Sequence, residues 1–270
     1  MLTILYAGSS LIAFAGEGND PAGARSAAMA NASVGLSDVW SNQHNQAGLA
    51  FVRNISGGAY YENKFMLREL STRAGALALP VRGGTFGLLV SNFGYRLYSE
   101  NKCALSFAKA FGEKFSMGIA MDYLNVMLGE GYGRKDMLVA EIGMLSKPLK
   151  NLTLGVHIYN PTRTKIAAYN NEHTPTIFRF GGNYVFSDKV LLAAETEKDI
   201  AHKALFKTGL EYQLLKALYL RAGISTNPVL SSFGFGLRLK NLQADLSSNY
   251  NQVLGFSQQL GLTYVVNKKS

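Results

Sequence analysis

The sequence predicts an all-β protein: a transmembrane antiparallel β-barrel of about 14 strands with an N-terminal helical segment in the lumen. Three observations support this prediction. Segments with alternating apolar and polar residues follow one another from about residue 55 onward. Short turns alternate with longer connections between them. A stretch of small residues near the N-terminus has helical rather than strand periodicity.

Residues 1–15 have the features of a signal peptide. An apolar stretch ends in Ala13-Phe14-Ala15, which matches the small-x-small pattern of a signal-peptidase site, and polar residues follow. We expect cleavage after Ala15, with Ala13 and Ala15 as the recognition residues. The alternative is a buried N-terminal strand or helix.

Residues 16–50 are predicted to form a plug in the lumen. Ser37 and Asp38 offer a helix cap, and the turn-rich stretch 42–48 follows. Small side chains allow one backbone to approach another closely, which suits a segment enclosed by a barrel. An amphipathic helix that caps a soluble domain is the alternative. One predicted helix face carries only small residues: Ala24, Ala27, Ala28, Asn31, Ala32 and Gly35.

Residues 51–270 are predicted to form the barrel, because many strand candidates have the length that a tilted membrane strand requires. Residues 151–160 alternate most clearly, with Leu152, Leu154, Val156 and Ile158 on one face. The candidates lie near residues 55–62, 70–80, 84–93, 103–111, 115–125, 136–146, 151–160, 175–186, 189–196, 203–213, 216–224, 232–240, 242–250 and 256–266.

The connections favour an outer-membrane barrel. The predicted short turns include 112–114, 147–150, 187–188 and 240–241. The predicted longer loops are 95–102, 129–135, 166–174 and 225–230. The apolar strand faces carry the aromatic residues that an interfacial girdle or the core of a soluble β-sandwich would have. Strand count favours the barrel, because a sandwich with one small and polar face on every strand has a poorly filled core. These aromatic residues are Phe178, Phe180, Tyr184, Phe186, Phe206 and Tyr212.

Two N-terminal motifs resemble the start of PorV/PorQ and FadL-like outer-membrane β-barrels of Bacteroidetes-type bacteria. The first is Gly23-Ala24-Arg25-Ser26 with the small-residue run that follows it, and the second is Asn45-Gln46-Ala47-Gly48-Leu49. The family usually has Pro where this chain has Gln46. The resemblance implies a lumenal segment ahead of the first strand, a place in the bacterial outer membrane, and a PorV/PorQ-like role in or beside a type IX secretion machine.

The charge distribution and the single cysteine exclude some classes of function. The net charge is +9, but Lys and Arg are spread over the whole chain, which suits anionic lipid headgroups or an acidic partner and does not favour nucleic acid. The single cysteine, Cys103, is expected to be a small wall residue.

Motifs for catalysis or metal binding are not evident. The four histidines have no partner at ligand spacing, so we expect no metal and no cofactor. No nucleophile elbow occurs, and Glu195 and Glu197 with the charged residues 198–199 are expected to lie in a solvated loop. We therefore expect a non-enzymatic protein.

Alternation also predicts polar contacts between the plug and the barrel lumen, although a solvated polar face without specific pairs is the alternative. The predicted contact residues are Arg25, Asp38, Asn45, Lys207, Glu211, Arg221, Arg238 and Asp245. Glycine pairs within strands are candidate sites of a wall opening, because glycine weakens a strand. They are Gly181 with Gly182, and Gly57 with Gly58.

These observations leave three functions open. The first is a structural or docking subunit of an outer-membrane protein machine, type IX secretion-like or an accessory of barrel assembly. The alternative is a FadL-like transporter of hydrophobic small molecules across the outer membrane. The third is a soluble β-sandwich binding protein. For the barrel functions, the expected partners are outer-membrane lipids and lipopolysaccharide, with a larger protein complex or a hydrophobic small molecule.

Overall fold

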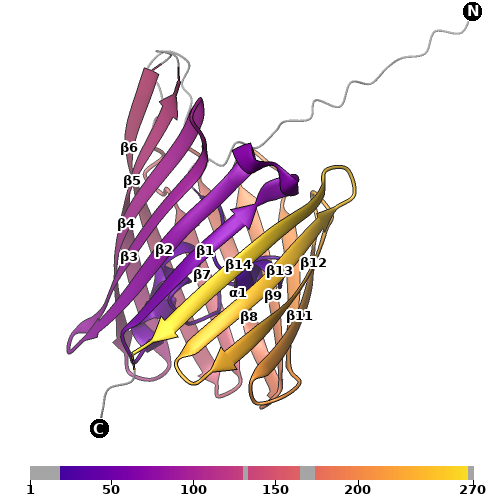
Figure 1. Cartoon of the computed structure of the whole chain (residues 1–270). Coiled ribbons are helices and arrows are strands. Elements are labelled where there is room, and N and C mark those ends of the chain that lie inside the picture. Colours follow the sequence, from indigo (N-terminus) through magenta and orange to yellow (C-terminus); the bar gives the residue numbers. More distant parts are fainter. Residues whose placement is uncertain (1–18, 130–132, 165–173, 267–270) are drawn as a thin grey trace, which may run out of the picture.

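The computed structural model describes residues 19–129, 133–164 and 174–266, and in them the strands form a closed antiparallel barrel (Figure 1). Each strand pairs with its neighbour in sequence, and the first pairs with the last. This confirms the predicted fold and strand count. The strands are β1 (Ser56–Asn63), β2 (Ser71–Val81), β3 (Gly84–Tyr95), β4 (Tyr98–Phe111), β5 (Phe115–Leu128), β6 (Gly133–Leu149), β7 (Leu152–Tyr159), β8 (Ile177–Ser187), β9 (Val190–Asp199), β10 (Leu205–Gln213), β11 (Leu218–Ser225), β12 (Leu230–Leu239), β13 (Leu242–Asn251) and β14 (Gly255–Val265).

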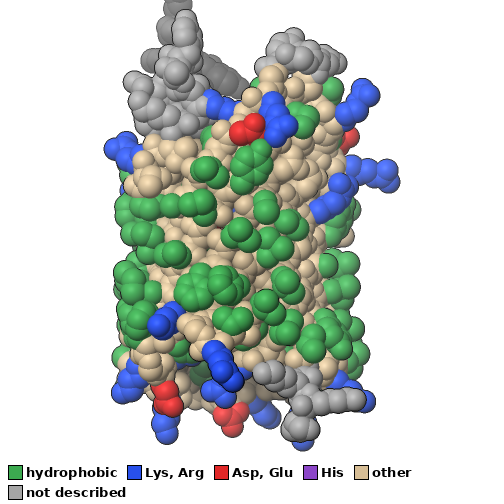
Figure 2. Space-filling model, turned by 90° about the vertical axis from the view of Figure 1, so that its left-hand side faces the viewer, with side chains coloured by type: hydrophobic (Ala, Val, Ile, Leu, Met, Phe, Trp, Pro, Cys, Tyr) green, Lys and Arg blue, Asp and Glu red, His purple; other side chains and the backbone are tan. Residues whose placement is uncertain are grey.

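The outer wall is apolar because every second residue of a strand points away from the lumen. On β12, Phe233, Phe235 and Leu237 are exposed, whereas Ser232 and Gly236, which alternate with them, are buried. Hydrophobic side chains cover the middle of the wall, and charged side chains gather toward its two ends (Figure 2). The aromatic residues predicted for the apolar faces of β8 and β10 all lie exposed on this wall. A continuous apolar surface of this kind suits a bilayer and not water.

The two ends of the barrel differ in their connections. One end has short turns at 82–83, 112–114, 150–151, 188–189, 214–217 and 240–241. The other end has the longer connections, including 64–70 and 160–176. Outer-membrane barrels place short turns in the periplasm and long loops outside the cell. The short-turn end of this barrel therefore corresponds to the periplasmic end of such barrels.

Some predicted loops are in fact strand. The predicted loop 95–102 reduces to residues 96–97, because the β3–β4 hairpin continues its pairing up to Tyr95 with Tyr98. The predicted loop 129–135 is likewise shorter, since β6 begins at Gly133. Most of the predicted loop 166–174, and the predicted signal peptide 1–15 with Ala13 and Ala15, lie outside the described residues.

The segment before β1 is only partly helical. It contains α1 (Ala24–Ala27), α2 (Ser41–His44) and the 3-10 helix η1 (Gln46–Phe51). The long helix face predicted over residues 24–35 is wrong, because Ala30 and Asn31 have φ values of 53° and 58°, a left-handed conformation that ends a helix. No helix among the described residues has the length and apolar character needed to cross a membrane.

Candidate functional site: the plugged lumen

The segment before β1 lies inside the barrel, and we call residues 19–55 the plug (Figure 1). Almost every plug residue from Ala22 to Leu49 is buried. Asp20 lies near the long-loop end, where its carboxylate is 2.8 Å from Lys64 Nζ. From there the plug descends to the short-turn end and enters β1 at Ser56. The described lumen is therefore filled along much of its length.

Inward-facing glycines let the plug approach the wall backbone. A Cβ atom built on Gly118 of β5 would lie 2.5 Å from the backbone nitrogen of Ala47, and one on Gly155 of β7 would collide with the carbonyl oxygen of Val34. A side chain at either position would force the plug or the wall to shift. Similar approaches involve plug residues and Gly58, Gly87, Gly143, Gly209, Gly223 and Gly234 of the wall.

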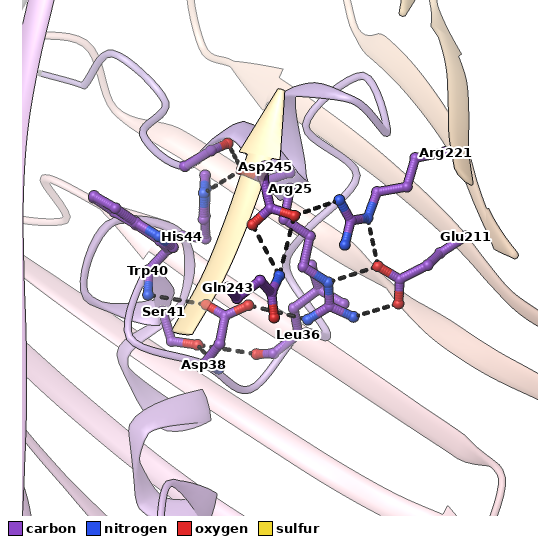
Figure 3. Close-up of polar contacts among 12 residues, drawn as sticks. Arg25, Leu36, Asp38, Trp40, Ser41, His44, Glu211, Arg221, Gln243 and Asp245 are labelled. Carbon is purple, nitrogen blue, oxygen red and sulfur yellow. Dashed lines mark hydrogen bonds and ion pairs between the residues drawn. The ribbon is translucent and has the colours of Figure 1, made fainter. Parts of the chain in front are cut away.

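Arg25 anchors the plug to one side of the barrel (Figure 3). Its Nε and Nη2 each lie 2.8 Å from a carboxylate oxygen of Glu211 on β10, and its Nη1 lies 3.1 Å from Asp38. Glu211 also accepts a 2.6 Å hydrogen bond from Arg221 on β11, which donates in turn to Asp245 on β13 at 2.6 Å. This chain of ion pairs is one cluster, which we call the Arg25 cluster.

Glu195 on β9 holds the plug through the plug backbone. One carboxylate oxygen accepts hydrogen bonds from the backbone nitrogens of Ser33 and Val34, both at 2.8 Å. The other accepts from Lys207 Nζ at 2.9 Å. Lys207 also bonds to Glu197, which pairs with Arg179 of β8 at 2.7 Å. The expectation that Glu195 and Glu197 lie in a solvated loop is wrong, because both occupy inward positions of a strand.

A third polar cluster surrounds Glu141 on β6. The Glu141 carboxylate lies 2.9 Å from Lys102 Nζ and 2.8 Å from His157 Nε2, and it accepts a 2.5 Å hydrogen bond from the Gln46 amide of the plug. Lys102 is also 2.8 Å from Asp122. Here the plug contributes a neutral amide, whereas in the Arg25 cluster it contributes a cation.

The residues predicted as plug–lumen contacts occupy different places. Arg25, Asp38, Glu211, Arg221 and Asp245 share the Arg25 cluster, and Lys207 belongs to the Glu195 group. Asn45 donates from its side-chain amide to the carbonyl oxygens of Val34 and Met144. Arg238 lies at the exposed short-turn end, where it donates to Gln243.

Sequence reasoning missed Glu141, Lys102, His157 and Arg179, together with the inward-facing glycines. The sequence does contain part of this information. The charged residues and His157 alternate with apolar residues along their strands, which places them on the inward face.

The wall is continuous at the predicted opening. Gly181 pairs with Gly155 and Glu195, and Gly182 pairs with Leu154 and Ala194. The irregularity of the β8–β9 ladder lies further along, between Val185 and Ser187. An opening at Gly181 and Gly182 stays a prediction, and it requires a change from the paired state described here.

Two hollows flank the β1–β14 seam at the short-turn end. A cavity of about 430 Å³ lies on the lumen side, against Arg25, Asp38 and Trp40. A hollow of about 410 Å³ lies on the outer side, where Gly57 and Ala59 leave space between larger apolar residues. Its lining comprises Ile55, Gly57, Gly58, Ala59, Leu77, Leu242, Leu262, Tyr264 and Val266.

Apolar side chains also reach the lumen, toward the long-loop end. A buried cluster joins inward positions of β5 to β8, next to the Glu141 cluster. It consists of Leu124, Met137, Val139, Tyr159 and Ile177.

Among the described residues, no group of three or more acidic, histidine or cysteine side chains is placed to hold a metal ion.

His44 joins the two ends of the plug. Its Nε2 lies 2.7 Å from the carbonyl oxygen of Ala22 and 3.0 Å from Ser26 Oγ. Burial, together with the charge of Arg179, lowers the pKa of His44 to about 4. His44 is therefore neutral at pH 7 and acts as a hydrogen-bonding group.

No protein-family profile matches the sequence, and no curated protein matches it. Solved structures share its fold at low sequence identity. A FadL homologue from Pseudomonas aeruginosa has 12% identity and a TM-score of 0.65, with 91% of this chain and 98% of the other covered. The toluene transporter TbuX of Ralstonia pickettii has 11% identity and a TM-score of 0.67, with 90% and 97% covered.

The toluene transporter TodX of P. putida has 12% identity and a TM-score of 0.68, with 92% of this chain and 99% of that chain covered. The chain thus has a FadL-like fold, which confirms that part of the resemblance. The comparisons do not single out PorV or PorQ. TbuX and TodX are toluene transporters.

Proposed function

We propose that this protein is a non-enzymatic transporter of small hydrophobic molecules across the outer membrane, in a state whose lumen is closed by the plug. The observation that carries the proposal is the likeness to hydrocarbon transporters over nearly the whole length of both chains. The apolar cluster around Tyr159 adds support, because it offers an apolar contact in a lumen lined mainly by polar and small side chains.

In this proposal the plug must move before a molecule can pass. The inward-facing glycines leave no gap between plug and wall, and the three polar clusters fix the plug on several sides. A disulfide bond between plug and wall should therefore stop transport. Ala24 and Gly261 of β14 are the chosen pair: a Cβ atom built on Gly261 lies 3.0 Å from Ala24 Cβ, and a shift of about 0.5 Å between plug and wall brings the two to the spacing of a disulfide.

The test uses Ala24→Cys with Gly261→Cys in a Cys103→Ser background, expressed in bacteria without FadL-like transporters of their own. Uptake of radiolabelled toluene and of a fluorescent fatty acid is measured. We expect the unmodified protein to raise uptake, the oxidised double variant to lose that gain, and reductant to restore it. Each single-cysteine variant is the control. Uptake that never exceeds the empty vector contradicts the proposal.

A structural or docking subunit of an outer-membrane machine is the second candidate, and the filled lumen favours it. A plug fixed by buried ion pairs makes the barrel a closed cylinder, which suits a subunit that contributes surface instead of a pore. Recovery of large outer-membrane proteins in stoichiometric amount, by pull-down in mild detergent, would support a PorV/PorQ-like or barrel-assembly role. Recovery of the barrel alone with bound hydrophobic molecules would support transport.

A further inference from the structure

The short-turn end of the barrel carries a ring of positive charge. Each of its turns contributes one exposed cation, and the carboxylates of these turns are only Glu113 and Asp188. The opposite end is less regular: the described turns 226–229 and 252–254 contain no charged residue, whereas Arg68, Arg96 and Lys203 lie in other connections there. The cations of the ring are Arg82, Lys114, Lys150, Lys189, Lys216 and Lys240.

The 430 Å³ cavity opens at the same end, beside Lys240 of the ring. Arg53, Arg238 and Lys240 line this cavity, and all three are exposed. Its two carboxylates, Asp38 and Asp245, are already paired inside the Arg25 cluster. Within the described residues, neither Arg53 nor Lys240 forms an ion pair. The uncompensated charge at the mouth is therefore positive.

We propose that the short-turn end binds an acidic polypeptide segment of a periplasmic protein, with carboxylates against the ring and one part of the segment in the cavity. Charge complementarity selects an acidic partner. The position of the cations selects a polypeptide over membrane lipid. Lipid headgroups surround the outside of the wall, whereas Arg238 is on the inward face of β12 and Arg53 lies between the plug and β1.

This surface is independent of transport through the lumen. A transporter and a docking subunit would both present it, because it is formed by turns and by the exit of the plug. The lumen-side cavity also places Trp40 and Val39 beside the cations, so the bound segment meets an apolar surface as well as charge.

The test uses the full-length protein in nanodiscs of phosphatidylcholine, which carries no net charge. The probe is a fluorescein-labelled oligoglutamate peptide, and binding is followed by fluorescence anisotropy over a range of salt concentrations. The mouth variant is Arg53→Glu with Arg238→Glu and Lys240→Glu. The matched control reverses three exposed cations at the long-loop end: Arg68→Glu, Arg96→Glu and Lys203→Glu.

We expect the unmodified protein and the control to bind the probe with the same affinity, and the mouth variant to bind about tenfold more weakly. Binding should weaken as salt rises. If Arg238→Glu disturbs folding, the Arg53→Glu and Lys240→Glu double variant keeps the test decisive, since both positions lie outside strands.

Equal affinity in the mouth variant, or no binding by the unmodified protein, overturns the proposal. A parallel measurement uses phosphatidylglycerol vesicles. If the mouth variant loses vesicle binding while the peptide never binds, the surface recognises lipid, and the proposal is also overturned. The readout is peptide binding and not uptake, so failure of this proposal is distinguishable from failure of the transport proposal.

Discussion

The two ends of the plug are held in different ways. The first part, around Arg25, is held by charge: one partly buried guanidinium faces Glu211 and Asp38. The second part, around Ala47, is held by close packing against Gly118 and by neutral amides such as Gln46. A polar lumen can therefore hold a segment either by ion pairs or by close packing. Loss of a charge should weaken the first kind of contact, and an added methyl group should weaken the second.

The charged anchor should give the largest effect. Arg25→Ala removes the cation that Glu211 and Asp38 share. Glu211 keeps its pair with Arg221 and Arg25 is partly exposed, so we expect a cost of about 2–3 kcal/mol, below the value for a fully buried pair. We expect this loss in the free energy of unfolding, measured by urea titration in detergent. Arg68→Ala, at an exposed loop position, is the control. A loss below about 1 kcal/mol, the range of a surface pair, would show that Arg25 is not an anchor.

The packed part should respond to a single methyl group. Gly118→Ala places a Cβ atom 2.5 Å from the backbone nitrogen of Ala47, so the plug must shift, at a cost of about 1–3 kcal/mol. Gly83→Ala is the matched control, because a Cβ atom there meets nothing within 4 Å. Equal unfolding midpoints for the two variants would mean that close packing does not hold this part.

The smallest expected change in stability concerns His44, whose hydrogen bonds to Ala22 and Ser26 connect the two parts of the plug. Its pKa is about 4 in the folded protein and about 6.5 when unfolded, so the unfolded state binds the proton more tightly. Stability is therefore complete above pH 6.5 and falls as the pH decreases toward 4, by up to about 2 kcal/mol at pH 5. Urea titrations at pH 7 and pH 5 measure the difference. His44→Gln should reduce it, and an unchanged pH dependence would assign it to other groups.

The inner and outer faces of the strands could be predicted from the sequence, since period-two alternation fixes them. Arg221 and Asp245 lie inward because alternation leaves no other choice on β11 and β13. The same argument was available for Glu195 and Glu197, which the prediction placed in a loop because four charged residues in a short stretch suggested solvent. Each carboxylate instead lies opposite Lys207 or Arg179, residues that pairing brings close.

The barrel, its number of strands and the enclosed N-terminal segment could be predicted because strand period, turn spacing and small residues are local properties of the chain. Which charges pair, and where the plug touches the wall, depends on the closed three-dimensional arrangement. Arg25 and Glu211 are 186 residues apart in sequence, and their contact depends on the path of the plug and on closure of the ring. The cations of the turns are likewise scattered in sequence, and barrel closure gathers them at one end.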